Sequence, residues 1–183
     1  QSLKSGTADL HRQTESSRLS VALMSENLSE KIYSDYLLRM KDIVEYYEAI
    51  VFPSLTDIIP DIEQRRKSQL IKNDLAFLQV DTAENSVTFS LPPAPCTGHL
   101  LGYMYVLEGS SLGGALIYKH VSSKINISEQ EGGEYFTCYQ SQLSSRWKSF
   151  IDILSDHGIS QQNAPGIISG ARIAFESISK HLD

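Results

Sequence analysis

The chain has 183 residues, of which 41% are hydrophobic and 21% are charged, and its formal net charge is −6. This length and composition predict a single domain over residues 1–183, with an ordinary hydrophobic core. The acidic balance disfavours nucleic acid as a partner. A membrane partner is equally disfavoured, because no apolar run reaches the roughly 20 residues that span a bilayer.

The N-terminus and the two cysteines indicate where the protein works. The chain begins at Gln1 and shows no basic-then-apolar leader. Cys96 and Cys138 are too few and too far apart for a disulfide framework or a zinc knuckle. We therefore expect both to be reduced thiols in a cytoplasmic protein.

Helical spacing of apolar residues dominates the first half of the chain. It predicts a first helix over residues 3–23, a second over 29–53 and a third helical stretch over 60–78, opened by a proline. The longest loop follows over residues 81–97. A short strand at 87–90 is conceivable, but it would be too isolated to be stable.

Helical spacing resumes near Thr97 and continues through a glycine-rich segment to about Lys124. The sequence E-Q-E-G-G-E at residues 129–134 interrupts it. Two further helices are predicted over residues 135–157 and 165–182. No repeat or domain linker is visible, so the sequence predicts an all-α fold.

The segment Y-V-L-E-G-S-S-L-G-G contains three glycines: Gly109, Gly113 and Gly114. A glycine in a helix interior costs roughly 1 kcal/mol relative to alanine, so three of them need a reason. A phosphate-binding loop is excluded, because Ala115 stands where that motif requires lysine. Packing between membrane helices is disfavoured by Glu108 and by the short length of the segment.

Two explanations for these glycines remain. One is close packing between two helices, which glycine permits. The other is a ligand surface: Gly109 and Gly113 share one helix face, and Ser110 and Gly114 continue that face one residue round. Without side chains, the backbone can approach a large flat ligand and the helix can kink. Such a surface suits a macrocycle better than a phosphate.

A macrocycle is usually held through a metal, and the best candidate ligand is His11. Glu15 lies one helical turn after His11, where its carboxylate can accept the proton on the imidazole nitrogen that faces away from a metal. The alternative is an ordinary exposed histidine–glutamate pair. The remaining histidines are predicted to be surface residues in loops or at helix ends: His99, His120, His157 and His181.

Together, these two segments resemble the haem oxygenase family. The pattern L-K-x-x-T-x-x-L-H-x-x-x-E around His11 resembles the proximal helix of that family, and Y-V-L-E-G-S-S-L-G-G resembles its distal helix. The stretches Arg146–Phe150 and Ala171–Phe175 are similar to the late helices of bacterial members. The order and spacing agree over nearly the whole chain.

The resemblance implies a helical bundle that holds haem between the N-terminal proximal helix and a kinked distal helix. His11 would be the axial ligand of the haem iron and Glu15 its supporting partner. Haem would be both substrate and cofactor, and with O2 and electrons it would be converted to biliverdin, CO and ferrous iron. A ferredoxin or a flavin reductase type of protein would supply the electrons. A neutral histidine ligand suits this chemistry better than a thiolate.

One departure from the family pattern concerns proton delivery. Many members carry aspartate directly after the first distal glycine, whereas this chain carries Ser110. The glycine–serine form resembles the bacterial branch that often accompanies phytochrome genes, so it does not indicate an inactive protein. Ser110 and Ser111 are the candidates for proton delivery through bound water.

Haem propionates require cations. The resemblance points to Lys4, two turns before His11, and to Lys119, after the distal glycines, with Arg146 as a third candidate. The alternative for each is a solvated surface charge.

Three other functions compete with a haem-degrading enzyme. A di-iron oxidase would need E-x-x-H pairs, and the sequence contains none. A non-catalytic haem-binding or haem-delivery protein of the same fold is favoured only by Ser110. A purely structural helical domain would leave the His11 and glycine motifs without a purpose.

Overall fold

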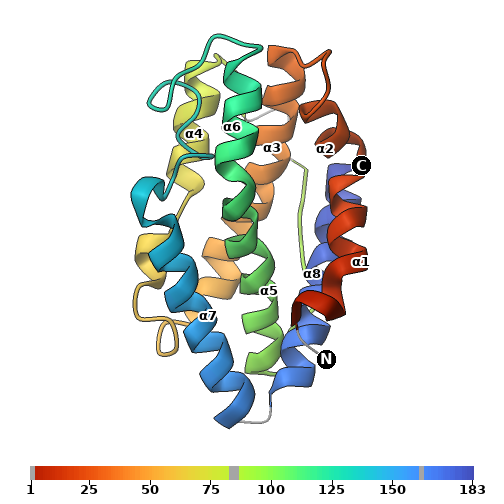
Figure 1. Cartoon of the computed structure of the whole chain (residues 1–183), viewed down its shortest axis with the longest axis vertical. Helices are drawn as coiled ribbons and strands as arrows, with labels where there is room; N and C mark the ends of the chain where they lie inside the picture. The colour runs from red at the N-terminus through yellow and green to blue at the C-terminus, as the bar shows by residue number, and fades with distance from the viewer. Residues whose placement is uncertain (1–2, 83–86, 161–162) are drawn as a thin grey trace.

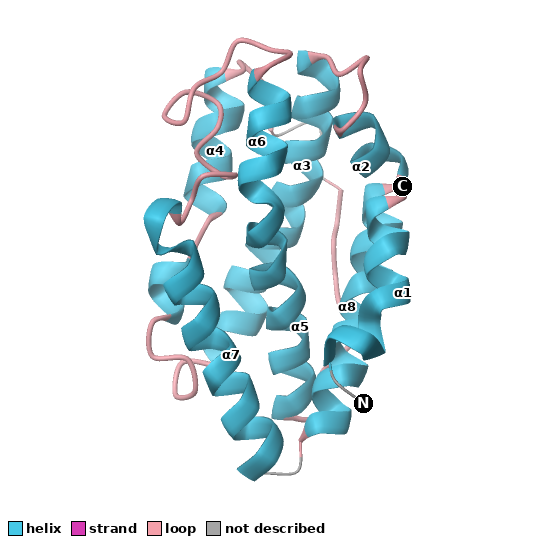
Figure 2. Cartoon of the chain, in the orientation of Figure 1, coloured by secondary structure: helices cyan, strands magenta, loops and turns pink. Residues whose placement is uncertain are grey.

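The computed structural model describes residues 3–82, 87–160 and 163–183 (Figure 1). Helices dominate it, and none of the described residues forms a strand (Figure 2). The α-helices are α1 (Leu3–Glu15), α2 (Arg18–Leu23), α3 (Glu30–Tyr46), α4 (Ser68–Phe77), α5 (Thr97–Ser110), α6 (Gly114–Ser122), α7 (Leu143–Ser160) and α8 (Ala164–Leu182).

Helices α5 and α6 form a central column in Figure 1, with α1 and α8 on one side and α4 and α7 on the other. Helix α5 makes its most extensive contacts with α8. These two helices approach closely because Gly102 of α5 and Gly170 of α8 lie at their crossing. A Cβ atom on Gly102 would overlap the backbone of Ile167, and one on Gly170 would overlap the backbone of His99.

The first predicted helix is in fact two, because the chain turns at Ser16 and Ser17. The Ser16 hydroxyl donates to the Arg12 carbonyl at 2.8 Å, and the Ser17 hydroxyl donates to the Thr14 carbonyl at 2.9 Å. Serine hydroxyls that satisfy the last carbonyls of a helix compete with its continuation. The prediction of one helix over residues 3–23 was therefore wrong at its centre.

The second and third predicted helices differ mainly at their ends. Helix α3 begins where expected, since the Ser29 hydroxyl accepts a hydrogen bond from the Ile32 amide. It continues through a π-helical turn (Tyr47–Val51) and a 3-10 turn (Phe52–Ser54). The third predicted helix was placed too early, because only a 3-10 turn (Ile62–Arg65) precedes α4.

The start of α4 is fixed by a residue from elsewhere in the chain. One carboxylate oxygen of Glu48 accepts hydrogen bonds from the Lys67 amide at 2.6 Å and the Ser68 amide at 2.9 Å. A carboxylate at this end satisfies free amides and opposes the positive end of the helix dipole.

The predicted helix over residues 135–157 begins only at Leu143. Gln140 has a φ of 43°, a left-handed conformation that cannot continue an α-helix. Upstream, the Tyr135 amide donates to the carboxylate of Asp74 on α4 instead of to a helical carbonyl. Residues 87–90, where a strand was conceivable but too isolated to be stable, form no strand, and Phe89 packs in the core.

The stretch Thr97–Ser122 is long and apolar enough to span a bilayer by length and composition alone. It is not one regular helix, since a 3-10 turn (Ser111–Gly113) separates α5 from α6. It also carries the ion-paired, buried Glu108 and packs along α8. These are the properties of a core helix in a globular protein.

Candidate functional site

The two helices that carry the motifs, α1 and α5, both pack against α8. The Tyr105 side chain of α5 lies close to the side chain of Thr7 on α1, whose hydroxyl donates to the Leu3 carbonyl at 2.9 Å. The two helices run in the same direction in Figure 1. Residues four apart share a helix face, so the turn beyond this contact carries His11 on α1 and Gly109 on α5. The structure therefore places His11 and the first distal glycine at corresponding turns of two helices that both pack against α8.

His11 has the surroundings of an oriented ligand. Its Nδ1 atom lies 3.5 Å from a carboxylate oxygen of Glu15, and the edge of its ring contacts Phe175 of α8. The side chain of His11 remains 59% exposed. With Nδ1 turned toward Glu15, the other ring nitrogen, Nε2, is the one available to a metal.

The three distal glycines have two different roles. A Cβ atom on Gly109 would meet only the Trp147 ring, at 3.7 Å, and one on Gly113 would meet only Ile117, at 3.9 Å. Both are ordinary contacts, so the protein's own packing does not require glycine at either position. Gly114 is different, because its Cβ would overlap the carbonyl oxygen of Phe136. The inclusion of Gly114 in the bare ligand surface was wrong.

Exposed apolar side chains surround this region. Leu112 and Leu116, near the distal glycines, are 46% and 67% exposed, and Val21 on α2 is 56% exposed. The end of α6 lies against the turn that follows α2, since the His120 ring nitrogen lies 3.1 Å from the Ser25 carbonyl oxygen. Exposed apolar side chains of this kind suit contact with a flat and mostly apolar macrocycle such as haem.

Ser110 lies at the end of α5, and its hydroxyl donates to the Leu107 carbonyl at 2.7 Å. It also contacts the side chain of Tyr135. A small cavity of about 20 Å³ adjoins it. That cavity is lined by Tyr36, Ser110, Ser111, Gly114, Ile117, Tyr135 and Phe136. The space is sufficient for about one water molecule next to the serine hydroxyls.

A larger cavity, of about 310 Å³, lies on a different side of α6. Ser111, Ala115 and Tyr118 supply one wall, and the segment 136–143 supplies another. This cavity does not include His11, Gly109 or Gly113. It is therefore a site separate from these three residues.

The three candidate cations are not gathered in one place. Lys4 and Lys119 are exposed on α1 and α6. Arg146 lies on α7, where its guanidinium donates to Asp61 at 3.2 Å and stacks over the Tyr139 ring. The structure thus engages Arg146 in protein contacts and leaves the two lysines free to meet a ligand at the surface.

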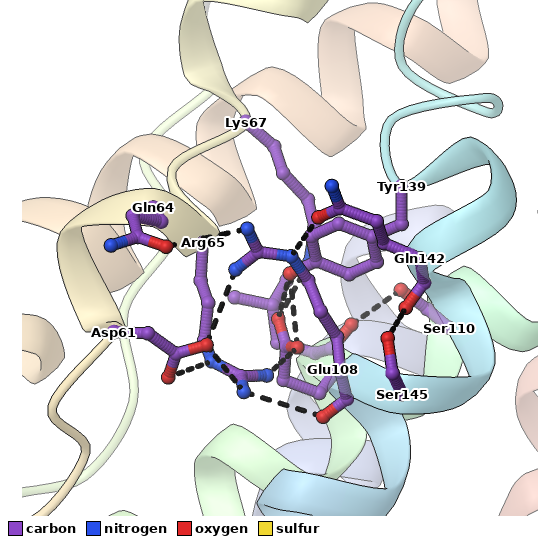
Figure 3. A network of polar contacts seen from close by, with 11 residues as sticks. Asp61, Gln64, Arg65, Lys67, Glu108, Ser110, Tyr139, Gln142 and Ser145 are labelled. Carbon is purple, nitrogen blue, oxygen red and sulfur yellow. Dashed lines mark hydrogen bonds and ion pairs between the residues drawn. The ribbon is translucent and has the colours of Figure 1, made fainter.

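A buried charge cluster next to the glycine face was missed from sequence (Figure 3). Glu108, directly before Gly109, is 2% exposed and pairs with Arg65 at 2.5 Å and Lys67 at 2.7 Å. The Tyr139 hydroxyl donates to the same carboxylate at 2.9 Å. These partners hold the pKa of Glu108 below its usual value although burial alone would raise it. The sequence signal that could have indicated this cluster was the single carboxylate, Glu108, in an otherwise apolar helix.

The expectation of a surface position was wrong for His181. Its side chain is 7% exposed, contacts the Phe89 ring and lies 3.5 Å from Asp42. Burial lowers the pKa of His181. His157 also differs from the expectation, since its Nδ1 atom is buried. Both cysteines are free thiols, as expected.

Comparison with known proteins decides the family. A profile of the family described as heme oxygenase matches residues 1–182. The chain belongs to the haem oxygenase family. Among its relatives, heme oxygenase PigA of Pseudomonas aeruginosa is 24% identical over 163 residues, which are 86% of this chain and 77% of PigA.

Solved haem oxygenase structures share the fold. The NO- and CO-bound heme oxygenase of Neisseria meningitidis aligns with a TM-score of 0.79 at 22% identity, over 98% of this chain and 87% of that one. Heme oxygenase from Leptospira interrogans aligns with a TM-score of 0.75 at 16% identity, over 98% and 96%. The expected all-α, haem oxygenase-like fold is therefore confirmed, and haem is the ligand that the family binds.

Proposed function

We propose that this chain is a haem-degrading enzyme that converts haem, with O2 and reducing equivalents, to biliverdin, CO and ferrous iron. The observation that carries the proposal is the His11–Glu15 pair on α1, together with Gly109 on α5 and Gly113 on η4 (the 3-10 turn Ser111–Gly113), two glycines that the protein's own packing does not require. Family membership supports the reaction class. Haem itself supplies the iron that activates oxygen, and the protein binds and orients it.

In this proposal His11 binds the haem iron through Nε2. Glu15 accepts the Nδ1 proton, which fixes the tautomer and raises the basicity of the ligand. The ring-edge contact with Phe175 limits rotation of the imidazole. A neutral imidazole ligand favours oxygen bound intact over the cleavage that a thiolate promotes.

The distal side admits the haem and holds water. In this proposal Gly109 and Gly113 let the backbone of the distal helix approach the macrocycle, since the protein's own packing does not require glycine at either position. Ser110 and Ser111 line the small cavity behind this face, where their hydroxyls would hold a proton-donating water.

Lys4 and Lys119 are the proposed partners of the haem propionates. Both are exposed, one on α1 and the other on α6. Arg146 is not retained in this role, because its guanidinium is engaged with Asp61 and Tyr139. We also propose that a protein of the ferredoxin or flavin reductase type supplies the electrons and that the enzyme works in the cytoplasm.

The test is to mix the protein with hemin, add ascorbate in air and follow the visible spectrum. We expect a Soret band on binding, then its loss with biliverdin absorbance in the red. His11→Ala should alter the ferric-haem spectrum and reduce turnover by about a hundredfold or more. Glu176→Ala, an exposed position on α8, is the control.

Other results would change the proposal in distinct ways. A stable haem complex whose ring never opens would identify a haem-binding or haem-delivery protein, the alternative that Ser110 favours. Absence of any Soret shift would remove both haem functions. An unchanged ferric spectrum in His11→Ala would overturn the assignment of the iron ligand.

A further inference from the structure

The carboxylate of Glu108 anchors the distal helix from behind. Glu108 accepts hydrogen bonds from Arg65, from Lys67 and from the Tyr139 hydroxyl, whose single proton lies within reach of both carboxylate oxygens, at 2.5 to 3.0 Å (Figure 3). Arg65 and Lys67 are at most 2% exposed. A buried carboxylate with this number of charged partners is fixed in position, because leaving any of them unpaired in the interior is costly.

The anchor reaches three other parts of the chain. Arg65 ends the 3-10 turn η3 (Ile62–Arg65) and also pairs with Asp61 and with the backbone carbonyl of Arg146. Arg146 returns to Asp61 at 3.2 Å. The cluster therefore joins the end of α5 to η3, to the turn that carries Tyr139 and to α7 (Figure 3).

The side of the same helical turn that carries Gly109 and Ser110 has no comparable anchor among the described residues. Gly109 follows Glu108 directly and has no side chain, and the regular helix ends at Ser110, where the 3-10 turn begins. Successive residues of a helix are about 100° apart around its axis, so the position of Glu108 sets the direction in which Gly109 and Ser110 face. The two buried cations also lie near the carboxyl end of α5, where positive charge is stabilising.

We propose that Glu108 is a positioning residue, whose anchored carboxylate sets the rotation of the last turn of α5 and thereby the orientation of haem against Gly109 and Ser110. This inference rests on the proposed function. In this proposal the charge cluster controls which edge of the macrocycle meets the distal helix. It thereby controls which ring-opened isomer forms. Glu108 acts through its neighbours and does not touch haem.

The decisive variant is Glu108→Gln, which keeps the size of the side chain and removes its charge. Proton NMR of the ferric haem complex reports in-plane haem orientation through the shifts of the haem methyl groups, without turnover. We expect a different methyl pattern from wild type. A displacement of about 1 Å can change rates by up to about a hundredfold, so the ratio of product isomers should change by about threefold or more.

A matched control separates positioning from stability. Asp42→Asn neutralises another buried carboxylate, on α3, whose described contacts include the Val87 amide and His181. It should lower stability without changing the methyl pattern or the isomer ratio. Glu108→Asp, which keeps the charge but shortens the side chain, should fall between wild type and Glu108→Gln.

Tyr139→Phe removes only the hydroxyl bonds to Glu108 and provides a milder variant should Glu108→Gln not fold. We expect it to shift the methyl pattern in the same direction as Glu108→Asp. A methyl pattern and isomer ratio equal to wild type in the folded variants would overturn the proposal. Failure of the wild type to open the ring would instead overturn the proposed function, and the methyl patterns would still test positioning.

Discussion

Asp74 shows how one buried group can make the stability of the protein depend on pH. Its side chain is fully buried on α4, and its two oxygens accept the amides of Glu134 and Tyr135, each at 2.9 Å. These bonds favour the charged form, but burial outweighs them and raises the pKa of Asp74 to about 6. The native state therefore holds a proton on this group at a pH where the unfolded chain has lost it.

The sign of the resulting pH dependence follows from linkage. Because the folded pKa is higher than the unfolded one, the contribution of Asp74 is fully present below about pH 4 and is lost as the pH rises through about 6. Between these limits we expect the unfolding free energy of wild type to fall by up to about 3 kcal/mol relative to that of Asp74→Asn. Urea unfolding of both proteins at several pH values measures this. A difference that does not vary with pH would contradict the assignment.

At the scale of the element, the break between α5 and α6 assigns different roles to two adjacent glycines. Gly113 ends the 3-10 turn with a φ of −82°, which any residue can adopt, and a Cβ there would make only an ordinary contact with Ile117 at 3.9 Å. Gly114 begins α6 against the carbonyl of Phe136. The protein's own packing explains the second glycine, and we propose that a ligand explains the first.

The two glycines therefore predict opposite results. Gly114→Ala should lower the unfolding free energy of the haem-free protein by about 1–3 kcal/mol, since a methyl group there meets backbone that cannot move cheaply. Gly113→Ala should leave that stability unchanged or raise it by up to about 1 kcal/mol. It should nevertheless weaken hemin binding. Urea unfolding and a hemin titration of both variants distinguish the roles. Equal losses of stability would refute the distinction.

At the scale of the whole molecule, the crossing of α5 and α8 links the distal helix to the N-terminal helix, because α8 also packs along α1. Gly170 brings the backbones of α5 and α8 together, and Phe175 of α8 contacts the ring of His11. The distance between α1 and α5 is thus set partly by α8, a third helix that carries neither the His11 motif nor the glycine motif.

Gly170→Ala tests this dependence. Its methyl group would overlap the backbone of His99. We therefore expect the unfolding free energy to fall by about 1–3 kcal/mol, which lowers Tm by several degrees. Gly158→Ala on α7 is the control, because a Cβ there meets only the end of the Ile167 side chain at 3.8 Å. Thermal unfolding of the haem-free proteins measures both. A Tm equal to wild type in Gly170→Ala would show that the helices can move apart at little cost.

Much of the fold could be predicted because helical periodicity is a local property. The apolar spacing located the starts of α3 and α5 and both ends of α8 closely, but it did not predict the 3-10 turn that separates α5 from α6. It missed the break at Ser16 and the late start of α4, since the first depends on serine hydroxyls bonding to backbone and the second on Glu48, which lies far back in the sequence. Ends of helices depend on single contacts that periodicity does not record.

The sequence by itself determined the helical class, the family and the His11–Glu15 pair, because residues four apart on a helix are neighbours wherever that helix packs. Only the tertiary structure decided that Gly114 serves packing, that Arg146 belongs to a protein cluster and that Glu108 is anchored by Arg65 and Lys67. Each of these depends on a contact between segments distant in sequence. Spacing along one helix does not contain that information.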